Sequence, residues 1–198
     1  MTAPLDAGTA GSKSGGPSFA LDHRLTRAAW AVCWALLAAW TPPPLHGWRR
    51  LLLRLFGARI APTAKVYGSA RVWYPPNLTM DDHSCLGPQV NCYCMAPISL
   101  GRHALASQGA YLCAGTHDID DPDFQLIVKP IRLGDGAWVA AQAFVGPGVT
   151  IGDHAVLGAR GVLFRDLAAG QVAAGNPAQV LRARRISESP IVTEEPKL

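Results

Sequence analysis

Charged residues are scarce in this 198-residue chain, because Asp, Glu, Lys and Arg together make up only 16% of it. The net charge of +4 comes mostly from arginines near the two ends, and no motif interleaves basic with aromatic residues. This scarcity argues against a broad nucleic-acid-binding face, so we expect no nucleic-acid partner. The sequence also lacks an apolar run of the roughly twenty residues that a transmembrane helix needs.

The five cysteines lack the spacing of a zinc site, since they form no Cys-x-x-Cys pair and have no suitably spaced histidine nearby. Four of them, Cys85, Cys92, Cys94 and Cys113, lie within one apolar stretch. We interpret them as buried thiols in a reducing compartment and expect no bound metal. Cys92 and Cys94 would share one face of an extended strand, which leaves a metal or disulfide role as an alternative.

Glycine and proline are abundant instead, with 20 and 16 residues, and hydrophobic residues make up 49% of the chain. This composition predicts many turns around one core. Residues 1–18 are rich in Gly, Ser and Ala without periodicity, so we predict a disordered tail there. Residues 186–198 are polar, and we predict a second flexible tail at that end.

Two helices are predicted within residues 19–57. The apolar stretch RAAWAVCWALLAAW ends at Trp40 and is followed by TPPP, which cannot continue a helix. The next stretch, HGWRRLLLRLFGAR, alternates arginines with leucines and predicts a short basic amphipathic helix. Two placements stay open: the helices lie in a membrane interface, or they pack against the main domain or another subunit. We accordingly expect a cytoplasmic protein, either free or at the inner face of the membrane.

From Ile60 onward an aliphatic residue recurs every six positions, and a small or β-branched residue follows four positions after it. Helices repeat every 3.6 residues and strands every two, so a period of six fits neither element alone. It fits a short strand plus a turn, and three such units close one triangular coil that pairs in parallel with its neighbours. Glycine often follows the aliphatic residue, where we expect it to accommodate an unusual turn backbone. The sequence therefore predicts an all-β parallel β-helix over residues 58–185.

The repeat breaks after Thr116, which would be the corner residue of its hexad. Residues 118–130 are too long for a corner and too polar for the interior, so we predict an extruded loop. His117 would stand at the prism edge where the loop leaves, half fixed by the scaffold and half exposed, as a general base requires. A solvent-facing turn histidine is the alternative interpretation.

The stretch LGDGAWVAAQAFVGPGVTIGDHAVLGARGVL resembles the hexapeptide-repeat acyltransferases, whose β-helix is left-handed. With THDIDDPDFQLIVKPI and VAAGNPAQVLRAR added, the likeness is to the sugar and serine O-acetyltransferases, most closely the colanic acid biosynthesis acetyltransferases, and spans about residues 25–185. The resemblance implies a homotrimer with active sites between subunits, acetyl-CoA as co-substrate and a sugar or glycan acceptor. The implied activity is transfer of an acetyl group to a sugar hydroxyl in exopolysaccharide biosynthesis.

In that family the histidine that opens the extruded loop is the catalytic base, and this position corresponds to His117. The resemblance also assigns acceptor binding to Asn91. Asp118 and Asp120 are loop acids that we consider for the acceptor and for orienting the imidazole, a role that a backbone carbonyl also fills. The positions that match coenzyme A contacts are Trp138, Ala141, Ala159, Phe164, Arg165, Asn176, Pro177 and Arg182.

Two other functions stay open at this point. The repeats could serve as a non-catalytic scaffold or trimerisation module, in which His117 would be incidental. The chain could also be an acyltransferase that uses another acyl chain or an amine acceptor. Thiol release by the native chain and by His117→Ala separates the scaffold from the enzyme, and competing acyl-CoA lengths separate the third possibility.

Overall fold

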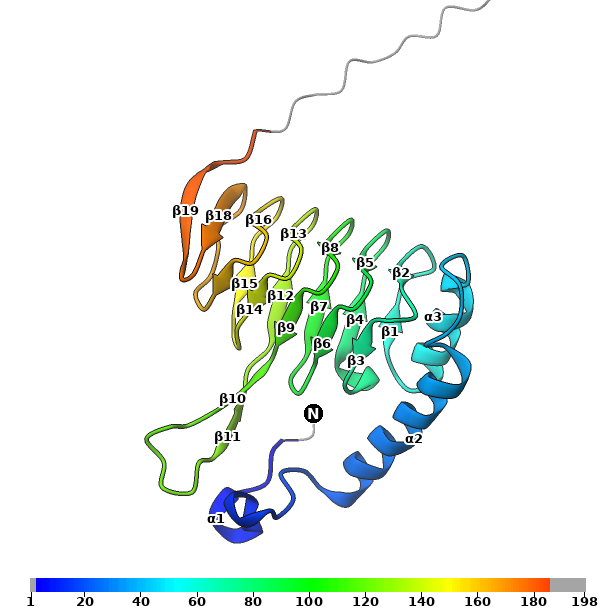
Figure 1. Ribbon diagram of the computed structural model, residues 1–198, viewed down its shortest axis with the longest axis vertical. Coiled ribbons are helices and arrows are strands. Elements are labelled where there is room, and N and C mark those ends of the chain that lie inside the picture. The colour runs from blue at the N-terminus through cyan, green and yellow to red at the C-terminus, as the bar shows by residue number, and fades with distance from the viewer. Residues whose placement is uncertain (1–2, 186–198) are drawn as a thin grey trace, which may run out of the picture.

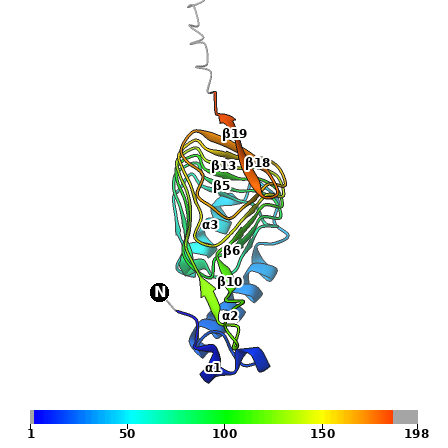
Figure 2. The ribbon, with the colours of Figure 1, turned by 90° about the vertical axis from the view of Figure 1, so that its left-hand side faces the viewer.

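The computed structural model of the protein describes residues 3–185, and its strands form the three faces of a prism (Figure 1). Figure 2 shows the coils overlying one another. Face A contains β1 (Arg59–Ile60), β4 (Leu78–Met80), β7 (Ile98–Leu100), β12 (Ile131–Leu133) and β15 (Thr150–Ile151). Face B contains β2 (Lys65–Val66), β5 (Cys85–Leu86), β8 (Leu105–Ala106), β13 (Trp138–Val139), β16 (Val156–Leu157) and β18 (Gln171–Gly175). Face C contains β3 (Arg71–Val72), β6 (Asn91–Tyr93), β9 (Tyr111–Cys113), β14 (Phe144–Val145) and β17 (Val162–Leu163).

The predicted parallel β-helix is confirmed, because strands within each face pair in parallel with the equivalent strands of neighbouring coils. The aliphatic residue that starts each hexad, from Ile60 to Leu163, points into the prism and is buried. A short 3-10 helix, η2 (Pro75–Asn77), occupies one corner, and β19 (Ala178–Ala183) folds back antiparallel on β18. The core is therefore one continuous apolar column along the prism axis.

The recurring glycines serve close packing between coils, which corrects our expectation that they accommodate the turn backbone. A Cβ atom on Gly152 would lie 2.5 Å from the backbone nitrogen of Ala169 in the next coil. The left-handed backbone occurs two residues later, at the third position after the hexad start. At this position His83, His103 and other non-glycine residues adopt φ values of 56° to 59°. The corner turn thus imposes the left-handed conformation on ordinary residues, whereas glycine provides clearance.

Two helices, α2 (Leu21–Leu37) and α3 (His46–Leu55), lie at the end of the prism where the repeat begins (Figure 1). Each coil donates backbone N–H groups to carbonyls of the following coil, as Lys65 N does to Ser84 O at 2.8 Å. The first-coil carbonyls that point away from the second coil have no preceding coil to donate to them, and side chains of the two helices supply the donors. The bonds are Arg54 Nε to Ile60 O (2.8 Å), Arg50 Nη1 to Ala64 O (2.8 Å), Arg49 Nη1 to Val66 O (2.8 Å), Trp34 Nε1 to Gly68 O (3.1 Å) and Trp30 Nε1 to Val72 O (2.7 Å).

We call α2 and α3 the helical cap, because they close the open end of the solenoid. Of the two placements left open by the sequence, packing against the main domain describes the inner side of these helices. Three arginines of the predicted basic amphipathic helix, Arg49, Arg50 and Arg54, donate inward to the first coil. Within residues 3–185, no helix combines the length and hydropathy of a membrane span.

The segment before the cap differs from the disordered tail that we predicted for residues 1–18. It contains α1 (Ala7–Ala10) and the 3-10 helix η1 (Ser12–Ser14). Left-handed glycines, Gly11 at φ 62° and Gly15 at φ 90°, end the two turns and let the short segment fold on itself. The tail predicted at 186–198 lies outside the described residues.

Candidate active site

The break in the repeat is a β-hairpin that leaves the corner between faces C and A (Figure 1). Its strands are β10 (Gly115–His117) and β11 (Leu126–Val128), which pair antiparallel. The coil ends two residues earlier than predicted, because Ala114 is its last buried residue before the hairpin and Thr116 is exposed on β10. The chain turns outward at Gly115, where a Cβ atom would lie only 2.4 Å from Met95 Sδ.

His117 ends β10 and is exposed, as a general base must be to reach a substrate. Its Nδ1 lies 2.8 Å from the backbone carbonyl oxygen of Phe124, across the hairpin. A carbonyl oxygen can only accept, so Nδ1 carries the proton and Nε2 keeps its lone pair in the neutral ring. The imidazole also stacks on the Phe124 ring, with centroids 4.7 Å apart and planes 15° from parallel. The arrangement presents a single basic nitrogen, Nε2, in a fixed orientation.

Phe124 adopts a left-handed backbone, with φ of 57°, to point its carbonyl at the imidazole. A bulky residue in this region is an outlier that surrounding structure must hold in place. The N-terminal segment provides that support, because Gln125 accepts from Ala7 N at 2.6 Å and donates to Leu5 O at 3.1 Å. Lys13 Nζ adds a bond to Pro122 O at 2.5 Å.

The loop acids make no hydrogen bond to the imidazole, so the Phe124 carbonyl rather than Asp118 or Asp120 orients His117. Asp118 Oδ1 accepts from the backbone N–H of Asp120 at 3.1 Å, and Asp121 Oδ1 accepts from Asp123 N at 2.9 Å. These bonds are Asx turns, which shape the loop tip. The carboxylates remain solvent-accessible there, close in sequence to His117.

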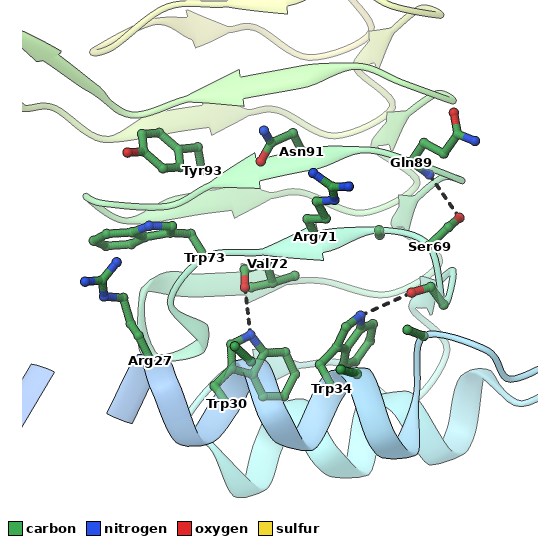
Figure 3. A pocket seen from close by; sticks show the side chains of 15 residues that line it. Arg27, Trp30, Trp34, Ser69, Arg71, Val72, Trp73, Gln89, Asn91 and Tyr93 are labelled. Atoms are coloured by element: carbon green, nitrogen blue, oxygen red, sulfur yellow. Dashed lines mark hydrogen bonds between the residues drawn. The ribbon is translucent and has the colours of Figure 1, made fainter. Parts of the chain in front are cut away.

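Asn91 lines a groove of about 1000 Å³ between α2 and face C (Figure 3). Arg27 lies over the Trp73 ring at 4.2 Å from its centroid, and Tyr93 meets Trp73 edge-on at 5.4 Å. Burial lowers the pKa of Arg27 below its ordinary value. His117 does not line this groove, so one chain does not bring it into a common pocket with Asn91.

The expected coenzyme A positions lie on the outside of the C-terminal coils. Ala141 and Ala159 share the corner between faces B and C, where Arg160 N donates to Ala141 O at 2.9 Å. Trp138 stands on face B and donates to Ser107 Oγ at 2.8 Å. The remaining positions are exposed on face C, on the corner after it and on the final hairpin: Phe164, Arg165, Asn176, Pro177 and Arg182. A single prism thus spreads the set over two faces and does not enclose it.

All five cysteines are free, and Cys92 and Cys94 are fully buried in the column. Within the described part of the chain, no group of three or more His, Cys, Asp or Glu residues is arranged to hold a metal ion.

Near the hairpin, burial first and then the neighbouring Cys113 raise the pKa of Tyr111 to about 12.

No family model matches the chain. The "Putative colanic acid biosynthesis acetyltransferase WcaF" of Escherichia coli (strain K12) is 44% identical over 155 residues, which cover 78% of this chain and 85% of that protein. This chain belongs to the hexapeptide-repeat acetyltransferases. A maltose O-acetyltransferase from Clostridium difficile 630 has the same fold, with a TM-score of 0.75 at 21% identity over 84% of this chain and 90% of that one. A hexapeptide-repeat acetyltransferase from Vibrio cholerae, solved with acetyl-CoA, has a TM-score of 0.74 at 22% identity over 84% and 91%.

In this hexapeptide-repeat acetyltransferase, the sequence left a loop acid or a backbone carbonyl to orient His117 and did not indicate which carbonyl. The orienting carbonyl of Phe124 and the support from Gln125 leave no sequence signal, because both depend on the pairing register of the hairpin. The groove beside Asn91 was also missed. Its Trp73 and Tyr93 lie on successive coils of face C, which the hexad spacing could have revealed.

Proposed function

We propose that this acetyltransferase transfers an acetyl group from acetyl-CoA to a hydroxyl of a sugar, with His117 as the general base. The observation that carries the proposal is the bond from His117 Nδ1 to Phe124 O, which leaves Nε2 as the free basic nitrogen on an exposed hairpin. A sugar hydroxyl is a weak nucleophile at neutral pH, so removal of its proton during attack is the chemistry that the reaction needs.

The mechanism requires no covalent enzyme intermediate. As the hydroxyl oxygen forms a bond to the thioester carbonyl carbon, its proton passes to His117 Nε2, and a backbone N–H at a prism corner stabilises the oxyanion. The carbon–sulfur bond then breaks, and the imidazolium returns the proton to the departing thiolate. The products are the O-acetyl sugar and free coenzyme A, and Phe124 O stabilises the imidazolium in between.

For the donor we propose a cleft between subunits of a homotrimer. The eight expected coenzyme A positions are accessible but lie on two faces of one prism, which fits a ligand held along a seam between neighbours. Faces B and C show apolar side chains outward, such as Trp138 and Phe144, whereas face A shows Thr79, Ser99 and Arg132. Arg165 and Arg182 are exposed and suit phosphate groups.

For the acceptor we propose Asn91 together with the loop acids Asp118 and Asp120. The amide of Asn91 both donates and accepts hydrogen bonds, and the neighbouring rings of Trp73 and Tyr93 offer flat apolar faces for a sugar ring. The name of the Escherichia coli relative supports an acceptor in exopolysaccharide synthesis. The five free cysteines are consistent with a reaction in the cytoplasm.

The test is thiol release from acetyl-CoA with a panel of glycosyl acceptors, comparing the native protein, His117→Ala and His103→Asn. We expect His117→Ala to lose about 10²–10⁴-fold in kcat, the usual contribution of a general base. His103 is an exposed histidine in a left-handed corner that asparagine tolerates, so His103→Asn should match the native rate. Equal rates for His117→Ala and the native protein would remove the imidazole from the mechanism, and no turnover by the native protein would favour a scaffold.

A further inference from the structure

The helical cap has an outer face that no residue between 3 and 185 covers. Residues 28–48 run from the middle of α2 through the connecting loop into α3, and they contain no Asp, Glu, Lys or Arg. Exposed apolar residues recur at helical spacing on both helices, so that each helix presents one apolar stripe away from the prism. We call these stripes the outer face. Its residues are Leu25, Val32 and Leu36 on α2 and Trp48, Leu51 and Leu55 on α3.

The outer face is not needed to stabilise the cap. The inner sides of the helices already bury Trp30, Trp34 and Leu53 against the first coil. Large apolar patches on soluble proteins usually mark contact sites, because exposing them to water is unfavourable. Leu36 is 65% exposed, and Trp40 beside it is 73% exposed.

Trp48 on the outer face and Trp40 beside it have no unmet polar group. Trp40 Nε1 donates to Leu36 O at 2.8 Å, and Trp48 Nε1 donates to Leu37 O at 2.7 Å. Their indole rings can therefore enter an apolar medium without leaving an N–H unpaired, which would otherwise carry a penalty.

A basic rim surrounds the prism at the same end. The outward residue on each face of the first coil is basic: Arg59 on face A, Lys65 on face B and Arg71 on face C. The equivalent residues of the second coil, Thr79, Cys85 and Asn91, carry no such charge. Between residues 19 and 80 the chain holds eight arginines and lysines against one acid, Asp22.

We propose that the outer face docks on the surface of a lipid bilayer that contains anionic lipids. The apolar stripes enter the boundary between headgroups and acyl chains, and the first-coil rim of Arg59, Lys65 and Arg71 lies at the headgroups. A second copy packed face to face would bring two basic rims together, which is repulsive, whereas anionic headgroups attract the rim. The contact is peripheral, and it holds the acetyltransferase with its helical cap toward the membrane.

The experiment is flotation of the full chain with vesicles of phosphatidylcholine alone and of two parts phosphatidylcholine to one part phosphatidylglycerol. The test variant is Leu25→Gln with Leu36→Gln, since glutamine keeps helix propensity at exposed positions. The control is Leu181→Gln, because Leu181 is 64% exposed on β19 at the opposite end of the prism. Native protein and control should float with the anionic vesicles, and the double variant should partition at least about tenfold more weakly.

Other readouts separate the outcomes. Raising the salt from about 0.1 M to about 1 M should weaken vesicle binding of the native protein, because the rim acts through screened charges. Circular dichroism checks that the double variant is folded, and sedimentation gives its oligomeric state. The proposal is overturned if the native protein stays unbound or if the double variant floats like the native protein. A double variant that falls apart into smaller species without vesicles present would assign the outer face to another copy of the chain.

Discussion

Replacing Arg49 with methionine should destabilise the protein strongly, because Arg49 is fully buried and joins the helical cap to the first coil. Its guanidinium donates to Thr41 Oγ1 at 2.9 Å, to Thr41 O at 3.0 Å and to Val66 O at 2.8 Å, with further bonds to Pro42 O and Pro43 O. Burial lowers the pKa of Arg49 from its ordinary value, and carbonyl dipoles rather than a carboxylate surround the charge.

The magnitude follows from the acceptors left behind. Each buried acceptor without a donor costs about 1–3 kcal/mol, and partial relaxation around Thr41 and Val66 leaves a net loss of about 3–5 kcal/mol. That is a large part of the roughly 5–15 kcal/mol by which domains are stable. Arg49→Lys should recover only part of the lost stability, since one ammonium group cannot reach all the acceptors that surround the planar guanidinium.

The assay is urea unfolding followed by tryptophan fluorescence, which reports on Trp30 and Trp34 in the cap. The matched control is Arg102→Met, because Arg102 makes an exposed ion pair with Asp135 at 3.4 Å that should be worth at most about 1 kcal/mol. If Arg49→Met and Arg102→Met lose the same stability, water must satisfy the first-coil carbonyls and the helices do not act as a cap.

Two further predictions concern burial and close packing. His23→Phe should stabilise the protein more near pH 5.5 than near pH 8, because burial and then Arg27 lower the pKa of His23 and both ring nitrogens are buried without partners. Below about pH 6.5 the unfolded chain therefore binds a proton at His23 that the folded chain does not bind, and this destabilises the native protein at low pH. Unfolding midpoints that shift equally at both pH values would contradict this. Gly152→Ala should cost about 1–3 kcal/mol through its contact with the Ala169 backbone. Gly170→Ala, in open space at φ 68°, should cost only about 1 kcal/mol, so a reversed order of melting temperatures would refute the packing role.

The repeat could be predicted because every hexad needs the same residue types at the same two positions. An aliphatic residue such as Val66 or Leu157 must point inward and a small residue must fit the corner, so sequence alone locates both. The start of the hairpin could not be located as well. Thr116 is small enough for a corner, and only the contact of Gly115 with Met95 shows that the coil ends earlier.

The position of His117 was predictable, whereas the sequence left its orienting group open between a loop acid and a backbone carbonyl. His117 stands where a polar segment interrupts an apolar repeat, which is visible in the sequence. Phe124 looks like an ordinary apolar residue there, and its left-handed backbone arises only when β10 and β11 pair. Backbone hydrogen bonds to side chains depend on register in three dimensions, so residue types do not reveal them.

The sequence left the placement of the α3 arginines open, because the need for side-chain donors exists only once coils are stacked. In a parallel β-helix each coil exchanges N–H and carbonyl groups with both neighbouring coils, so both ends of the stack leave backbone groups that need side-chain partners. The first end exposes carbonyls, and it receives donors from Arg49, Arg50 and Arg54. At the other end, Thr150 N donates to the carboxylate of Asp166 at 2.7 Å. Arginines before a hexapeptide repeat can therefore serve as donors to the first coil, and only charges beyond that need, such as the first-coil rim, indicate a partner.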